Sequence, residues 1–310
     1  MVEFETIINP PQEVFDQLAQ LTSDPPENWC FKSEDYDLWK TTYDQLWLVT
    51  VVEKGTTNFV ASVSLTRWDG PDGALYSIGM FYCKGKFRGQ GFGKPIFQKV
   101  FDIIGDNNAT LTGAVKMSAK YDKVFGFNKC PEHWHWFSSV KCADVKIPDT
   151  VSKEYLTNDW SEVDYEALTA YDRTICTRDR KKYITAWFKL PESVTRVVLN
   201  KSGQIVGYAT IRPVLNNRLS PAPFYADNLE AAEVLLKDLL NSIPNWREYE
   251  TFGFTYPGCN KDPVILLEKY SNSKDSISTV KFFRSQFTKK LIATPDQKVY
   301  SVSDNAHQFV

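Results

Sequence analysis

The residues best suited to bind a phosphate group form a glycine-rich run, Arg88-Gly89-Gln90-Gly91-Phe92-Gly93-Lys94. The run follows Phe81–Cys83, an apolar, aromatic stretch typical of the end of a buried strand. It is followed by apolar residues at helical spacing, namely Ile96, Phe97, Val100, Phe101 and Ile104. Free N–H groups and the dipole at a helix N-terminus attract anions, and glycines let the backbone approach a ligand closely. The run therefore predicts a phosphate-binding turn, with a glycine turn that binds nothing as the alternative.

Three kinds of phosphate-binding loop can follow a strand in this way. A P-loop would need Ser or Thr at the position of Pro95, where no hydroxyl is available for magnesium. A dinucleotide-binding loop would need glycine at the position of Lys94. The third pattern, [QR]-x-x-G-x-[GA], is matched in full by Arg88, Gly91 and Gly93.

The strand before the loop extends this match, because Phe81-x-Cys83-x-Gly85-x-x-Arg88 is similar to L-x-V-x-P-x-x-R. On these motifs the chain resembles the GNAT superfamily of acetyltransferases. The resemblance implies acetyl-CoA as co-substrate and a primary amine as acceptor, which attacks directly in a ternary complex. It also implies that the amides of residues 88–94 hold the pyrophosphate, and that the strand at Phe81–Cys83 hydrogen-bonds the pantetheine arm. A backbone N–H near Cys83 would polarise the thioester carbonyl.

Candidates for proton transfer follow the loop. Tyr121 begins a segment similar to the family's Y-x-x-x-G-F, in which the Tyr protonates the CoA thiolate, but it stands one residue early. That shift turns a helical side chain by about 100°, so Tyr121 is either the general acid or a packed aromatic. His133 and His135 are candidates for the general base, because the pKa of histidine lies near neutrality. The alternative is an ordinary half-exposed strand. No metal is expected, because His307 is the only other histidine and H-E-x-x-H is absent.

The order of the expected elements predicts two modules. Residues 1–148 read as a strand, two helices, three strands, the glycine loop with its helix, a strand and a helix, which resembles the GNAT order. A similar order repeats over residues 149–310, which predicts a second copy of the fold. Its expected elements include a first strand at Val145–Ile147 or Val151–Leu156, a helix at Tyr165–Tyr183, and closing strands at Val280–Leu291 and Val299–Val302. The fold class is therefore predicted as α/β with a mixed sheet, a tandem GNAT acyl-CoA N-acyltransferase fold of two modules.

The second module is predicted to be degenerate. Its residues Gly207–Arg212 and Ala226-Asp227 resemble the C-terminal module of two-domain GNAT proteins of the YitH type. The counterpart of the glycine loop, Phe224–Glu230, contains no glycine and no basic residue. Asp227 and Glu230 would repel a pyrophosphate and suit the start of a helix instead. We expect CoA in the first module alone, with the acceptor between the modules or against the first helices. Candidates for the acceptor wall are Tyr36, Trp39, Arg67 and Trp68.

Composition sets the remaining expectations. The chain has 310 residues, 43% hydrophobic content and a net charge of −2, which fits a globular protein and gives no electrostatic case for nucleic acid. No apolar run approaches the roughly 20 residues of a membrane helix, and the first residues lack a signal-peptide core. The six cysteines are scattered and are expected to be reduced, so the expected compartment is the cytosol, with the nucleus as the alternative. A monomer or a homodimer is expected.

Two other classes of function stay open. The chain could be a catalytically inactive acyl-CoA-binding protein or scaffold, because fold does not fix function. It could also be an interaction module that uses some of its nine tryptophans as exposed anchors.

Overall fold

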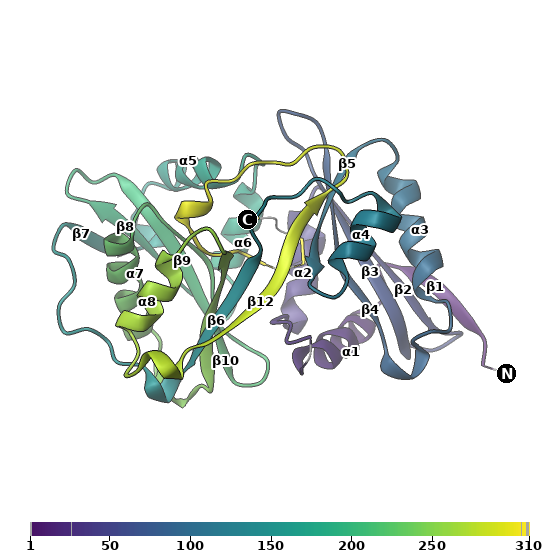
Figure 1. The fold of residues 1–310 in the computed structure, drawn as a ribbon, viewed down its shortest axis with the longest axis horizontal. Coiled ribbons are helices and arrows are strands. Elements are labelled where there is room, and N and C mark those ends of the chain that lie inside the picture. Colours follow the sequence, from purple (N-terminus) through teal and green to yellow (C-terminus); the bar gives the residue numbers. More distant parts are fainter. Residues whose placement is uncertain (1, 26, 305, 308–309) are drawn as a thin grey trace.

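One mixed sheet runs through the computed structural model, which describes residues 2–25, 27–304, 306–307 and 310 (Figure 1). The first half of the chain supplies β1 (Phe4–Ile8), α1 (Gln12–Ser23), α2 (Ser33–Thr42), β2 (Gln45–Glu53), β3 (Phe59–Trp68), β4 (Leu75–Cys83), α3 (Gly93–Ile104), β5 (Asn108–Ala114), α4 (Ser118–Phe125) and β6 (His135–Lys141). The second half supplies β7 (Tyr155–Asp159), α5 (Tyr165–Ile175), α6 (Lys181–Phe188), β8 (Val194–Asn200), β9 (Ile205–Val214), β10 (Arg218–Ala226), α7 (Leu229–Ser242), β11 (Thr251–Pro257), α8 (Asp262–Lys269), β12 (Ser278–Phe287) and β13 (Val299–Ser301).

Helices cover both faces of the first half of the sheet. Successive residues of each strand point to opposite faces, so that each strand packs against both layers of helices. On β2, Leu48 packs in the cluster that contains α1 and α2, whereas Val49 packs in the cluster that contains α3. The helix α3 buries Ile96, Phe97 and Val100 on one side and exposes the other, as its 3.6-residue pattern predicts. The sheet thus separates two apolar layers, and the glycine loop lies at the start of the α3 layer.

The two halves of the chain exchange strands. The order across the sheet is β1-β2-β3-β4-β5-β12-β6-β11-β10-β9-β8-β7, with β13 paired to β10. The strand β12 lies antiparallel between β5 and β6, and Figure 1 shows it in yellow beside the teal β6. The prediction that the last strands close the second half alone was therefore wrong, since β12 pairs with two strands of the first half. The division at residue 148 stays a prediction.

Two further expectations about the second half need correction. Its first strand is β7, which begins at Tyr155, and Val145 makes only an isolated bridge to Ser271. The helix expected at Tyr165–Tyr183 is broken into α5 and α6. The chain turns back at this break, so that Arg180 forms a buried ion pair with Asp172. Arg180 Nε lies 3.1 Å from Asp172 Oδ2. In one continuous helix, residues eight apart would be separated by about 12 Å along the axis.

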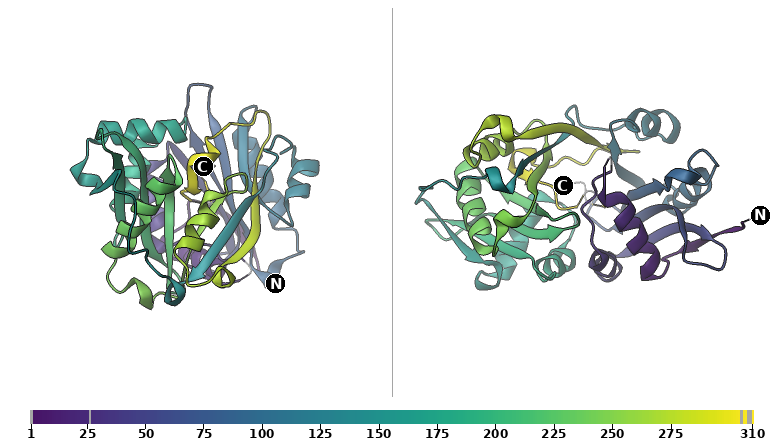
Figure 2. Two further views of the ribbon diagram at one scale, coloured as in Figure 1. Left: turned by 60° about the vertical axis from the view of Figure 1, so that its left-hand side comes forward. Right: turned by 90° about the horizontal axis from the view of Figure 1, so that it is seen from below.

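The halves pack on each other through a shared core, and Figure 2 shows them side by side. Asp35 on α2 forms a buried two-pronged ion pair with Arg212 on β9, with N–O distances of 2.6 and 2.8 Å. Trp39 and Trp68 of the first half share one apolar cluster with Tyr183 of the second. Among the described residues no helix is long and apolar enough to cross a membrane, and all six cysteines are free thiols.

Candidate active site

The strands β4 and β5 pair over only part of their length. Their parallel ladder runs from Leu75 opposite Asn108 to Ile78 opposite Leu111 and then ends. Beyond that point β4 continues to Cys83 and β5 to Ala114, whose other edge pairs with β12. Divergence of two parallel strands leaves backbone N–H and C=O groups on their facing edges without ladder partners. The point where β4 and β5 part is therefore the candidate place in the first half for an extended ligand to pair with a strand edge.

A bulge redirects β4 where the two strands part. Met80 has a φ of +45°, which is strained for a residue with a side chain. The register between β3 and β4 shifts here, and the hydroxyl of Ser62 donates to the carbonyl of Met80 at 2.8 Å. Bulges of this kind re-aim a strand and recur beside functional sites.

The glycine loop joins the end of β4 to α3 and lies largely exposed. Gly89 and Gly91 have φ values of +79° and +91°, a conformation that favours glycine. Gly93 is needed for a different reason, because a Cβ there would lie 3.0 Å from the ring of Phe81. The three glycines thus maintain an open loop that comes close to the strand.

The N-terminus of α3 carries no side-chain cap, since Phe92 precedes the helix. A helix begins with N–H groups that have no partner within it, and these attract an anion when no side chain covers them. However, not all of the amides of residues 88–94 are available to bind a phosphate. The amides of Arg88 and Gln90 bond to Gly85 and Phe87 within the turn, at 3.2 and 3.4 Å. The Arg88 side chain also folds back, donating from Nε to the Cys83 carbonyl at 2.9 Å.

The matching place in the second half is filled by the chain itself. The strands β10 and β11 pair only at Arg218–Thr251 and Leu219–Phe252 before they part. Into the space between them comes β13, which pairs with β10 at Phe224–Ser301 and Tyr225–Val299. The amide of the next residue, Val302, donates to the Thr255 carbonyl of β11 at 2.9 Å. The helix α7 is capped by Asn228, whose Oδ1 accepts from the Ala231 amide at 3.0 Å. This half thus satisfies its own strand edge and helix start.

Tyr121 packs as a core aromatic, which is the alternative that the sequence left open. Its ring stacks on Phe97 at 6.0 Å and lies edge-on to Phe127 at 6.4 Å. Burial raises the pKa of Tyr121 to about 12. Its role as general acid stays a prediction.

The structure does not bring His133 and His135 together with the glycine loop. His135 begins β6 and His133 precedes that strand, which lies three strand positions, or about 14 Å, from β4. His133 Nε2 lies 3.2 Å from Asp296 Oδ2, and the His135 ring stacks on Phe283 at 4.5 Å. Burial, with a smaller contribution from His133, lowers the pKa of His135 to about 3. A general base must come within hydrogen-bond reach of the proton it takes, so a base role for either residue stays a prediction.

A third histidine, near the end of the chain, lies against the first half. His307 is fully buried, with Nε2 2.7 Å from the Ser64 hydroxyl and its ring edge-on to Trp39 at 4.7 Å. The carbonyl of Ala306 lies so close to Gly79 that a Cβ there would be 2.1 Å away. Burial lowers the pKa of His307 to about 4. The sequence offered no signal for this contact, which joins residues far apart in the chain.

The candidate acceptor wall is mostly core. Tyr36 stacks on Phe15 and donates to the Pro10 carbonyl at 3.1 Å, and Trp68 is buried beside Tyr43. The ring of Trp39 contacts His307, as described above. Arg67 is partly exposed and pairs with Asp69.

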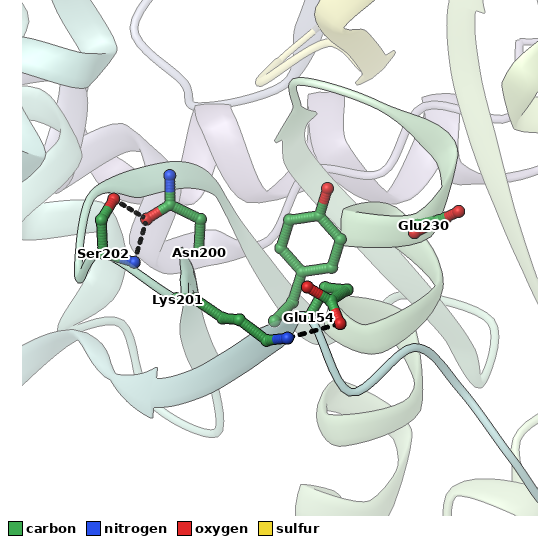
Figure 3. A pocket seen from close by; sticks show the side chains of 6 residues that line it. Glu154, Asn200, Lys201, Ser202 and Glu230 are labelled. Carbon is green, nitrogen blue, oxygen red and sulfur yellow. Dashed lines mark hydrogen bonds and ion pairs between the residues drawn. The ribbon is translucent and has the colours of Figure 1, made fainter.

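A surface hollow of about 390 Å³ lies over the β8–β9 turn, far along the sheet from β4 (Figure 3). Lys201 pairs with Glu154 at 2.6 Å, and Asn200 accepts from the amide and hydroxyl of Ser202. These contacts are those of an ordinary exposed turn.

The repeated order of elements and the two places where parallel strands part define a tandem GNAT fold, and comparisons with known proteins agree. A candidate acetyltransferase from Pyrococcus horikoshii is 14% identical with a TM-score of 0.68, covering 98% of this chain and 96% of that one. A tandem GNAT protein from the clavulanic acid biosynthesis pathway is 12% identical with a TM-score of 0.65, covering 97% and 100%. Saccharomyces cerevisiae N-myristoyltransferase with bound myristoyl-CoA is 11% identical with a TM-score of 0.61, covering 98% and 89%. The predicted fold class is thus confirmed.

The chain belongs to the family described as "Protein of unknown function (DUF1248)", whose model matches residues 2–175. The model described as "Acetyltransferase (GNAT) domain" matches residues 168–247. That second match falls on the half whose motifs resemble the YitH type. No curated protein matches the chain.

Proposed function

We propose that the first module, residues 1–148, is an N-acetyltransferase that binds acetyl-CoA between β4 and β5. One observation carries the proposal: in the first half the ladder between these strands ends at Ile78 and Leu111, whereas in the second half β13 fills the matching place. The pantetheine arm of CoA carries amide groups that can pair with a strand edge as β13 does. In the first module a ligand would therefore occupy the place that β13 occupies in the second module.

Each part of the site has a distinct role in this proposal. The amides of Gly91 to Lys94 and the uncapped α3 N-terminus bind the pyrophosphate. The edge of β4 at Phe81 and Cys83 holds the pantetheine arm, and an N–H beyond the Met80 bulge polarises the thioester carbonyl. A neutral primary amine attacks that carbon, the C–S bond breaks, and the CoA thiolate leaves. Rate comes from positioning the two substrates and from removal of one amine proton.

His307 is our candidate for accepting that proton, ahead of His133 and His135. Its ring contacts Ser64 of β3, and the carbonyl of the preceding Ala306 lies close to Gly79 of β4, adjacent to the bulge. Its Nδ1 has no hydrogen-bond partner among the described residues, and its low pKa keeps the ring neutral at pH 7. The acceptor would approach from the face covered by α2 and the C-terminal segment.

The alternative function is a non-catalytic acyl-CoA-binding protein. It is favoured by the burial of Ala306 and His307 against β3 and β4, because this segment covers one face of the site. The two functions differ in one measurement, the release of free thiol from acetyl-CoA in the presence of a panel of primary amines. Saturable CoA binding without thiol release on any amine would favour the binding protein.

Calorimetry with CoA on two matched variants tests the site itself. Gly91→Glu places a carboxylate in the loop, where repulsion of the pyrophosphate should weaken binding by roughly 100-fold or more. Gly203→Glu is the control, because Gly203 also has a positive φ and open space at its Cβ but lies in the β8–β9 turn. It should bind CoA like the unchanged protein. No heat with the unchanged protein, or equal binding by both variants, would contradict the proposal.

A further inference from the structure

Three side chains with metal-binding atoms meet near the β6–β11 edge, outside the proposed CoA site. They are His133 before β6, Cys259 after β11 and Asp296 in the strap that leads from β12 to β13. His133 Nε2 lies 3.2 Å from Asp296 Oδ2, Cys259 Sγ lies 3.7 Å from the same oxygen, and all three atoms fall within 4.8 Å of one another. Three segments distant in sequence thus present three different donor atoms to one point.

These separations suit a tetrahedral ion. With zinc bonds of about 2.0 Å to nitrogen or oxygen and about 2.3 Å to sulfur, ligand atoms at the tetrahedral angle lie roughly 3.3 Å apart for N and O and roughly 3.5 Å apart for S and O. The observed 3.2 and 3.7 Å are close to these values. Imidazole nitrogen, thiolate sulfur and carboxylate oxygen together favour zinc over magnesium or calcium, which prefer oxygen alone.

The surrounding residues hold the three donors in place. Asn260 is fully buried. Its side-chain Nδ2 donates to the backbone carbonyls of Gln297 and Val299, which ties the loop after β11 to the strap. The Gly258 amide donates to the Trp134 carbonyl at 2.7 Å, which ties the same loop to the start of β6. Neighbours that orient metal ligands in this way are typical of built metal sites.

The second oxygen of the carboxylate is also accounted for. The Thr294 hydroxyl donates to Asp296 Oδ1, which leaves Oδ2 directed at His133 and Cys259. Cys259 is exposed, so an ion can reach the donors from solvent.

A second observation points to a ligand at this place. His133 and Asp296 line a cavity of about 150 Å³, into which His135 and Ser285 also face. Both of the latter residues are more than nine-tenths buried, yet His135 Nδ1 and Ser285 Oγ have no hydrogen-bond partner among the described residues. Buried polar atoms are rarely left unpaired, and a water or small anion on an open coordination position would pair with them.

We propose that His133 Nε2, Cys259 Sγ and Asp296 Oδ2 bind one Zn²⁺ ion, with a fourth position open to this cavity. The ion would fasten the strap to the ends of β6 and β11, and thereby fix β13 in the second module. The proposal is independent of CoA binding.

The test uses the full chain, stripped with a chelator and then titrated with Zn²⁺ against a chromophoric indicator. We expect one zinc ion per chain. Cys259→Ser should weaken binding by more than the roughly 10- to 100-fold that changes around a metal ligand cost. Cys130→Ser is the matched control, because Cys130 is a free thiol close to His133 in sequence but not one of the three donors, and it should bind like the unchanged protein.

A spectroscopic measurement on the unchanged protein keeps the proposal testable even if a variant fails to fold. Bound Co²⁺ should give a thiolate-to-metal absorption band in the near ultraviolet, and added Zn²⁺ should abolish it. A stoichiometry of zero, a Co²⁺ spectrum without the thiolate band, or equal zinc affinity for Cys259→Ser and Cys130→Ser would overturn the proposal.

Discussion

The two places where parallel strands part, β4/β5 and β10/β11, differ in what satisfies them. In the second half, β13 pairs with the edge of β10 and Asn228 caps the helix that follows. In the first half, the ladder simply ends at Ile78, and a glycine loop leads into a helix without a side-chain cap. The second half thus closes with its own strand the place that matches the end of the β4/β5 ladder. In the proposed function, a repeated fold keeps one copy open to a ligand and closes the other with its own chain.

The closing segment belongs to both places. After β13 the chain continues to the first half, where His307 and Ala306 contact β3 and β4. Asp304 accepts hydrogen bonds from Tyr43 of the first half and Tyr183 of the second, at 3.1 and 2.9 Å. The contrast between the two places thus depends on how firmly the halves and this segment are joined.

The largest expected effect comes from the buried pair that joins the halves. Asp35→Ala leaves the Arg212 guanidinium buried without its carboxylate, which should lower the free energy of unfolding by about 3–5 kcal/mol. Because the two halves share a core, we expect a single unfolding transition in chemical denaturation, with a lower denaturant midpoint than that of the unchanged protein. Asp37→Ala is the control, since Asp37 is exposed on the same helix and should change stability little. Equal midpoints for the two variants would show that the halves do not depend on this pair.

The next largest effect is expected from acid, which should lower the free energy of unfolding through His307 in the C-terminal segment. The folded state lowers the pKa of His307 to about 4 from an ordinary value near 6.5, because burial disfavours the charged ring. Its contribution to stability is thus complete above about pH 6.5 and is lost as the pH falls towards 4, by up to about 1.4 kcal/mol per pH unit.

A variant without this titrating group separates its contribution from the rest. His307→Gln should flatten the pH dependence of the unfolding free energy between about pH 6.5 and 4, although His135 adds a similar slope that persists to lower pH. Denaturant titrations at several pH values measure both curves. An unchanged slope in the variant would argue against the buried placement of this ring. Loss of thiol release by the same variant at pH 7, with CoA binding intact, would support its role as base.

The sequence predicted the local parts of this arrangement better than the distant ones. The glycine loop and its helix followed from turn chemistry and a 3.6-residue period, and the acidic residues Asp227 and Glu230 indicated the start of the helix α7. The insertion of β12 and β13 could not be predicted, because strand pairing depends on register between segments remote in sequence. The same limit applies to the proposed zinc donors. The prediction of no metal considered the histidines and the H-E-x-x-H motif, whereas the other two proposed donors are Cys259 and Asp296.

A smaller effect would sharpen the contrast at the helix starts. Asn228→Ala removes the cap of α7 and should cost about 1 kcal/mol of stability, measured by denaturant titration. It should not create a second CoA site, because β13 still occupies the edge of β10. Calorimetry should therefore give the same stoichiometry before and after the change. A second equivalent of CoA in the variant would mean that the cap, rather than the inserted strand, closes this half.

The smallest expected effect is at Tyr121, where the sequence left two roles open. Its ring packs against Phe97 and Phe127 in the layer beneath α3, contacts that phenylalanine can also make. Tyr121→Phe should change the free energy of unfolding by less than about 0.5 kcal/mol and leave kcat for thiol release unchanged. A general acid contributes typically 10²- to 10⁴-fold to rate, so a drop of that size at unchanged stability would restore the catalytic role. Unchanged turnover would mean that water or another group protonates the leaving thiolate, and that the first module's chemistry rests on its strand edge and loop.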